Sequence, residues 1–170
     1  MVSNGEMRSK NNVKIITRCG MLIALSAIGA MIKIQGTIAL DSMPGFFAAL
    51  YISPLAGGLV AALGHLLTSV TSGFPLTIPM HLMLTIVMGL IAFVFGVLGK
   101  KTNGFIACTV ATILNGPIST MIAAFSAKAF GLPFNGAAMF NALVVPLTIA
   151  SAVNIVLAYI IFKIMRNKRI

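Results

Sequence analysis

The apolar residues of this chain occur in long blocks, separated by short polar, glycine- or proline-containing stretches. Blocks of about 20 apolar residues have the length that an α-helix needs to cross the hydrocarbon core of a membrane. The pattern predicts an all-α membrane protein with six transmembrane helices. Their predicted ranges are residues 15–34, 44–53, 55–72, 80–99, 105–128 and 138–163. The second range is too short to cross alone, so we expect it to be tilted or continuous with its neighbours inside the protein.

The composition agrees with this class. Of the 170 residues, 59% are hydrophobic and 8% are charged, whereas a soluble domain has about 25% charged residues. These proportions exclude a soluble globular enzyme, a disordered tail and a disulfide scaffold. Six spans of about 20 residues leave about 50 residues for loops and tails. Residues 1–170 are therefore expected to form a single integral membrane domain.

The charge pattern predicts the orientation of the helices. The net charge of +10 comes from 12 Lys and Arg residues against two acidic residues, Glu6 and Asp41. If the N- and C-termini are both cytoplasmic, only Lys33 and Lys128 fall on the outside, as the positive-inside rule requires. Topology thus explains the basic charge, and nucleic acid is not an expected partner. The prediction is a multi-pass protein of the cell membrane.

Polar residues are rare in the predicted spans, and they share helix faces. In the third span His65, Thr68, Ser69 and Ser72 recur at intervals of three or four residues, which places them on one face. Similar faces hold His81 and Thr85 in the fourth span, Asn115 and Ser119 in the fifth, and Asn141, Thr148, Ser151 and Asn154 in the sixth. Polar groups in a membrane are costly unless they line a cavity or find partners. The faces therefore predict one outward-facing substrate pocket between the helices.

The loops at residues 35–43, 72–79 and 130–136 are expected to form the lid of this pocket. The candidate substrate-binding residues are His65, Thr68, Ser69, Ser72, Phe74, His81, Thr85, Asn115, Ser119, Asn141, Asp41 and Lys128. Structural alternatives exist for them, because Ser and Thr in membrane helices often bond the carbonyl four residues earlier. Asparagines could link helices, and Lys128 could anchor a helix end at the interface. The prediction rests on the convergence of four faces.

Several functions are excluded by what the sequence lacks. The string VFGVLGKKT has Val94 and Lys101 where a phosphate-binding loop needs Gly and Ser or Thr. No carboxylate lies in a predicted span, where proton- and sodium-coupled transporters usually place one. No catalytic set, metal-ligand cluster or cofactor motif is present. The prediction is a non-catalytic binder that depends on an external source of energy.

With these features the sequence resembles the substrate-binding S components of energy-coupling factor (ECF) transporters. The resemblance rests on the small-residue segments RCGMLIALSAIGA (18–30) and SPLAGGLVAALGH (53–65), and on the short second span. It implies a prokaryotic six-helix subunit that captures a vitamin and works with a transmembrane scaffold subunit and two cytoplasmic ATPases. In that family small residues of the first helix dock on the scaffold. The residues implied here are Gly20, Ala24, Ser26, Ala27 and Ala30.

The string GHLLTSVTSGFPLTIPMHL (64–82) resembles the branch proposed to take up α-ribazole, a cobamide precursor with a dimethylbenzimidazole and a ribose. This implies that His65, His81, Asn115 and Asn141 bond a ring nitrogen or ribose hydroxyls. The scarcity of cations among the pocket residues favours a neutral ligand, while lysines at the rim leave an anionic vitamin such as pantothenate as an alternative. A stand-alone facilitator or channel, a membrane enzyme and a purely structural subunit are the alternatives from other classes.

Overall fold

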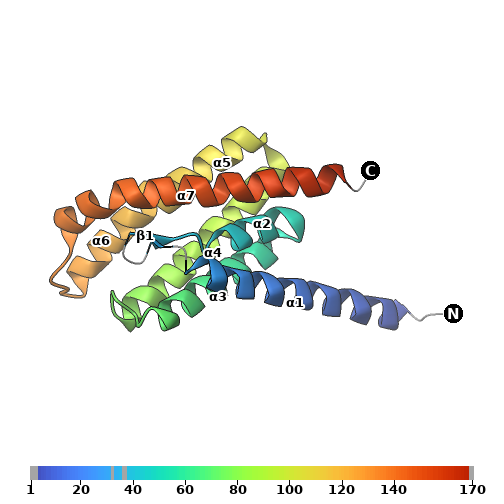
Figure 1. Cartoon of the computed structure of the whole chain (residues 1–170), viewed down its shortest axis with the longest axis horizontal. Coiled ribbons are helices and arrows are strands. Elements are labelled where there is room, and N and C mark those ends of the chain that lie inside the picture. The colour runs from blue at the N-terminus through green and yellow to red at the C-terminus, as the bar shows by residue number, and fades with distance from the viewer. Residues whose placement is uncertain (1–3, 32, 36–37, 169–170) are drawn as a thin grey trace.

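The computed structural model describes residues 4–31, 33–35 and 38–168 (Figure 1). Within these ranges the chain is helical, as the sequence predicts, apart from one short antiparallel ribbon. The elements in chain order are α1 (Asn4–Gly29), β1 (Lys33–Gln35), β2 (Ile38–Ala39), α2 (Met43–Tyr51), α3 (Pro54–Thr71), α4 (Ile78–Lys101), α5 (Gly104–Ile113), the π-helical turn η1 (Leu114–Ile118), α6 (Ser119–Ala129) and α7 (Gly136–Asn167).

Five helical segments of the described chain are long and apolar enough to cross a membrane. They are Asn11–Gly29, Pro54–Thr71, Ile78–Lys101, Gly104–Ala129 and Gly136–Asn167. The fourth of these is the continuous run of α5, η1 and α6. The remaining helix, α2, has nine residues and is about 13 Å long, against a hydrocarbon thickness of about 30 Å. The described residues therefore form six helical segments, of which five have spanning length.

The short helix α2 lies inside the bundle. Its residues from Pro44 to Ala49 are all buried. Figure 1 shows α1 leading away from the N-terminus and α2 leading back toward the end of the molecule where both termini lie. The ribbon and α2 together thus make the return path that the sequence assigns to the second span. Non-helical backbone at this depth is tolerated where protein surrounds it or where it lines a cavity.

The first helix and the loop after it differ from the prediction. α1 already begins at Asn4, in the polar N-terminal segment, and ends at Gly29 rather than near residue 34. Any side chain at Gly29 would overlap the carbonyl of Leu40, so the segment before α2 packs directly on the end of α1. After this contact the chain pairs Lys33 with Ala39 in the ribbon. The expected loop 35–43 is therefore partly a β-ribbon.

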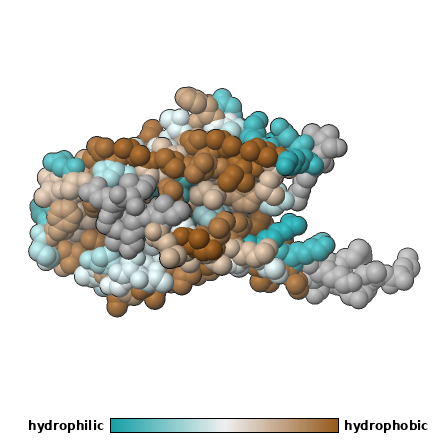
Figure 2. Space-filling view, in the orientation of Figure 1, coloured by the Kyte–Doolittle hydropathy of each residue, from teal (hydrophilic) through white to brown (hydrophobic). Residues whose placement is uncertain are grey.

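Small residues and aromatic rings hold α2, α3 and α4 together. A Cβ atom at Gly58 would lie 2.9 Å from the carbonyl oxygen of Gly89, so the backbones of α3 and α4 nearly touch. Phe46 of α2 meets Phe95 of α4 edge to face, with 5.4 Å between ring centroids. On the face shown in Figure 2, the described surface is largely apolar over the middle of the molecule, and hydrophilic residues gather toward its ends. This distribution fits a protein that is surrounded by lipid.

Candidate functional site

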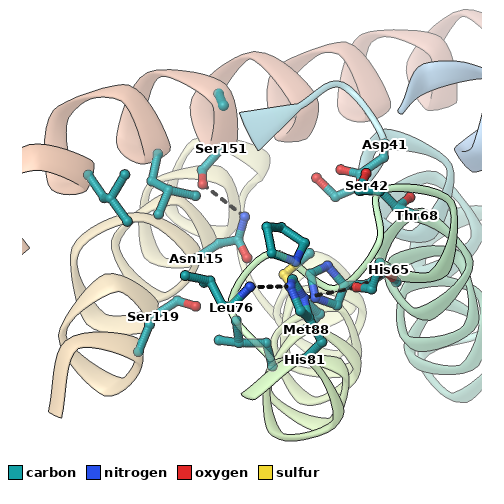
Figure 3. Close-up of a pocket in the computed structure, with 18 of the residues that line it drawn as sticks. Asp41, Ser42, His65, Thr68, Leu76, His81, Met88, Asn115, Ser119 and Ser151 are labelled. Carbon is teal, nitrogen blue, oxygen red and sulfur yellow. Dashed lines mark hydrogen bonds between the residues drawn. The ribbon is translucent and has the colours of Figure 1, made fainter. Parts of the chain in front are cut away.

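A cavity of about 430 Å³ lies between α3, α4, α7 and the run α5–η1–α6. This volume is in the range of small-molecule sites, which are mostly apolar with a few placed polar groups. The polar lining residues are Asp41, Ser42, His65, Thr68, Ser69, Ser72, His81, Asn115, Ser119, Ser151 and Asn154. Figure 3 shows Asn115, Ser119 and Ser151 on one side of the cavity, and Asp41, Thr68 and His65 on the other. The polar faces of several helices therefore do meet around one space.

Ser69, Leu76 and His81 form a hydrogen-bonded group that we call the fixed corner. The Ser69 hydroxyl donates to the carbonyl of His65 at 2.7 Å, and its oxygen lies 3.0 Å from Nδ1 of His81. The backbone N–H of Leu76 donates to Nε2 of His81 at 3.3 Å. Because a backbone N–H can only donate, Nε2 accepts, and the proton of the neutral ring is on Nδ1. Both ring nitrogens are thus occupied, and they tie the 72–77 loop to α3 and α4.

This loop is held in a strained conformation. Phe74 and Thr77 have positive φ angles of 50° and 80°, which residues other than glycine rarely adopt. The Phe74 ring meets the His81 ring edge to face, with 5.8 Å between centroids. Backbone strain of this kind persists when the surrounding contacts fix the chain. The fixed corner supplies such contacts.

His65 and Asn115 differ from the fixed corner, because each has a buried polar atom without a partner among the described residues. These atoms are Nε2 of His65 and Oδ1 of Asn115, and we call the two residues the open pair. The amide nitrogen of Asn115 donates to the hydroxyl of Ser151 at 2.8 Å, which leaves its oxygen as the free acceptor. A buried polar atom without a hydrogen bond costs about 1–3 kcal/mol. A ligand that formed hydrogen bonds with these two atoms would remove this cost.

The π turn η1 explains the position of Asn115. Pro117 lies inside the turn and has no backbone N–H, so the α-helical ladder cannot continue through it. The structure has a π turn here, a feature that is frequent at functional sites. A Cβ atom at Gly116 would lie 2.7 Å from Oγ1 of Thr148, so α7 packs directly on the turn. The turn thus brings Asn115 to Ser151.

Asp41 lines the cavity from the segment just before α2. Burial raises the pKa of its carboxyl group to about 6, while hydrogen bonding with the Thr68 side chain and with its own backbone acts in the opposite direction. The carboxyl group therefore changes charge slightly below neutral pH. No Lys or Arg is among the described residues that line the cavity.

Some polar residues near the cavity have structural roles. Oδ1 of Asn154 accepts a hydrogen bond of 2.8 Å from the backbone N–H of Met43, so this α7 side chain caps the first turn of α2. Its amide nitrogen donates to the carbonyl of Ala150 at 2.9 Å. Thr85 donates to the carbonyl of His81 at 2.7 Å, within its own helix. These hydrogen bonds hold the protein's own backbone, and this is the structural role that polar residues in membrane helices can have instead of binding substrate.

The predicted binding residues fall into three groups. Eight of them line the cavity: Asp41, His65, Thr68, Ser69, Ser72, His81, Asn115 and Ser119. Phe74 and Thr85 are not among its lining residues, and Asn141 and Lys128 line a separate groove between α6 and α7. Whether the eight residues bind substrate remains a prediction.

Sequence reasoning missed many of the apolar lining residues and several polar ones. Ser151 and Asn154 lie on the predicted polar face of the sixth span but are not among the predicted binding residues, and Ser42 gives no signal of its own. Apolar lining residues such as Met139 and Leu147 have the same sequence pattern as core or lipid-facing residues. Only three-dimensional packing distinguishes them.

The predicted docking residues on α1 lie on two faces. Ser26 and Ala30 are buried, and a Cβ atom at Gly64 would lie 2.8 Å from Oγ of Ser26, so this face packs on α3. Gly20 and Ala24 are exposed, and Ala27 is half-buried. Only the second group leaves backbone accessible to another helix.

Comparison with known proteins agrees with this architecture. The family model of the ECF transporter substrate-specific component matches residues 14–166, a range that includes every residue that lines the cavity. Searches of curated proteins and of solved structures gave no match. The family consists of integral membrane transporter subunits rather than catalysts, and this chain belongs to the ECF transporter substrate-specific component family.

Proposed function

We propose that this protein captures a vitamin or vitamin precursor outside the cell and is the substrate-binding subunit of an ECF-type importer. A transmembrane scaffold subunit and two cytoplasmic ATPases would drive the uptake. Family membership supports the transporter role. The observation that carries the proposal is the cavity, two of whose lining residues, His65 and Asn115, each have a buried polar atom without a hydrogen-bond partner among the described residues.

The proposed orientation has cytoplasmic termini and a cavity that opens outward, in the membrane of a prokaryotic cell. Both termini lie at one end of the molecule (Figure 1). Lys100 and Lys101 end α4, and Arg166 lies in the last turn of α7. The positive-inside rule favours the cytoplasmic side for such cations. The loop that carries Leu76 belongs to the opposite side and would cover the substrate.

The proposed substrate is α-ribazole. Its flat benzimidazole would lie against apolar lining residues such as Leu84 and Leu143, and a ribose hydroxyl would donate to Oδ1 of Asn115. Nε2 of His65 would bond a second polar atom. Pantothenate is the alternative among vitamins, but its carboxylate would meet Asp41 and no described cation in the cavity.

The test is binding followed by reconstituted uptake. Mass spectrometry of the molecule that co-purifies should find a neutral benzimidazole nucleoside, and the purified protein should bind α-ribazole more tightly than pantothenate. Uptake into liposomes should require the scaffold and both ATPases with a working ATP site. Conductance, or downhill flux through this protein alone, would instead establish a facilitator or channel and contradict the proposal.

The two faces of α1 allow a matched test of scaffold docking. Ala24→Trp should prevent co-purification with the scaffold while ligand binding persists, because Ala24 is exposed. Ala30→Trp should lower the unfolding temperature, because Ala30 is 6% exposed and has no room for an indole. If Ala24→Trp assembles normally, the scaffold docks elsewhere.

A further inference from the structure

A groove of about 380 Å³ lies between α6 and α7, apart from the substrate cavity. The cavity and the groove lie against different faces of these two helices. Ala123 and Met139 line the cavity, whereas their neighbours Ala124 and Phe140 line the groove. The lining residues of the groove are Met121, Ala124, Phe125, Lys128, Gly136, Ala137, Phe140 and Asn141.

The walls of the groove follow helical spacing. Met121, Ala124, Phe125 and Lys128 are three or four residues apart, so they form one stripe along α6. The stripe is about 10 Å long and is apolar except at its last residue. Met121 and Phe125 are 44% and 67% exposed. Ala124, between them, is 3% exposed. The stripe therefore has a buried floor and exposed side chains beside it.

The charge of the groove is at one end. Lys128 lies in the last turn of α6, close to the α6–α7 loop, where a membrane helix pair reaches the interface. Asn141 lies more than one turn into α7, further from this loop. Both side chains are exposed. Asp41, the one acidic residue whose side chain the structure describes, lines the other cavity. The groove thus presents a cation at the interface, with a mostly apolar channel below it.

We propose that this groove binds one phospholipid with an anionic headgroup. The lysine ammonium would bond phosphate oxygens, and an acyl chain would lie along Met121 and Phe125. An anionic lipid matches this arrangement, because its charged headgroup lies at the interface and its acyl chain extends from there into the membrane. A helix of another protein would bury Lys128 and would need to bring its own carboxylate to this position. The proposal does not depend on which vitamin the cavity holds.

The test uses nanodiscs with equal amounts of phosphatidylglycerol and phosphatidylcholine. Native mass spectrometry of the released protein should find one retained phosphatidylglycerol. Lys128→Gln should lower its retention about fivefold, since one lysine near anionic lipid contributes that much. Lys163→Gln is the matched control, because Lys163 is exposed beside the Tyr159 ring at the other end of α7 and should not alter retention. Ala137→Phe fills the groove at an exposed position and should lower the retention of both lipids.

Equal retention in the wild type and Lys128→Gln would overturn the proposal. Stabilisation of the protein against thermal unfolding by inorganic phosphate alone would also overturn it, because the groove would then be a site for a free anion. A dimer that Lys128→Gln dissociates would assign the groove to a second copy of this chain. A loss of phosphatidylcholine equal to that of phosphatidylglycerol in Lys128→Gln would also contradict it, because the charge would then play no part.

Discussion

The fixed corner and the open pair lie in the same cavity but differ in how their hydrogen bonds are used. In the fixed corner both ring nitrogens of His81 have partners, on Ser69 and Leu76. In the open pair Nε2 of His65 and Oδ1 of Asn115 are buried without partners in the described chain. The two imidazole rings are only 5.7 Å apart. Neighbouring residues of one type can therefore have different tasks, and the hydrogen-bond partners indicate which is which.

The difference separates stability from recognition. A saturated group such as His81 contributes to the folded state whether or not a ligand is present, and a ligand must break its bonds to use it. An unsatisfied group destabilises the empty protein and is stabilised by the ligand. The open pair belongs to different walls, α3 and η1, so a ligand that bonds both residues would link the two parts of the bundle. Mutations in the fixed corner should consequently lower the unfolding temperature, and mutations in the open pair should mainly lower substrate affinity.

The largest effect is expected from His81→Ala. It removes two hydrogen bonds, leaves the N–H of Leu76 without its acceptor and empties a buried site, for a cost of about 2–4 kcal/mol. The unfolding temperature of the detergent-purified protein without ligand should fall by several degrees. Ser72→Ala is the control in the same cavity and should change it little. A normal unfolding temperature with complete loss of ligand binding would mean that His81 is itself a ligand contact.

The open pair should show the opposite behaviour. His65→Phe keeps an aromatic ring but removes the unpartnered nitrogen, so the unfolding temperature without ligand should stay the same or rise. Substrate affinity should fall more than tenfold, about 1.4 kcal/mol. Asn115→Leu should weaken binding at least as much, with some loss of stability because the bond to Ser151 is lost as well. Affinity measured by isothermal titration with α-ribazole tests both variants, and unchanged affinity in both would remove the open pair from the binding site.

Much of this arrangement follows from periodicity in the sequence. Intervals of three and four residues place His65, Thr68, Ser69 and Ser72 on one face of α3, and the structure brings that face to the cavity. Periodicity says which residues share a face, but it does not say which neighbouring face they meet. Asn141 satisfies the same rule, yet it lines the groove outside. The packing of α7 against its neighbours decides this.

The hydrogen-bond partners of the pocket residues cannot be predicted from the sequence for the same reason. The link between Leu76 and His81 needs a loop with positive φ at Phe74 and Thr77, and neither residue type indicates such a conformation. The short second span is the opposite case. Its length alone excludes an ordinary crossing, and the structure has the buried helix α2, which Asn154 caps from α7.

A smaller effect is expected from pH, through Asp41 at the edge of the open pair's cavity. Its pKa is raised by burial from 3.8 to about 6, so the folded chain holds the proton more tightly than the unfolded chain. The stability that protonation provides is present at low pH and is lost as the pH rises from about 4 through about 6. The unfolding temperature should therefore be higher at pH 5 than at pH 7.5. Asp41→Asn should remove this difference, and a difference of the same sign that persists in this variant would contradict the assignment to Asp41.

The smallest effect is expected from Thr77→Gly in the loop that the fixed corner holds. Thr77 has a φ of 80°, is exposed, and makes no side-chain capping bond to α4. Glycine adopts this angle without strain, so the substitution should raise stability by about 1 kcal/mol, less the entropy that glycine adds to the unfolded chain. Thr71→Gly is the control, because Thr71 is a helical residue near the end of α3 and should be destabilised by a similar amount. If Thr77→Gly lowers the unfolding temperature instead, the bonds of His81 do not set this loop conformation, and the distinction between the fixed corner and the open pair loses its structural basis.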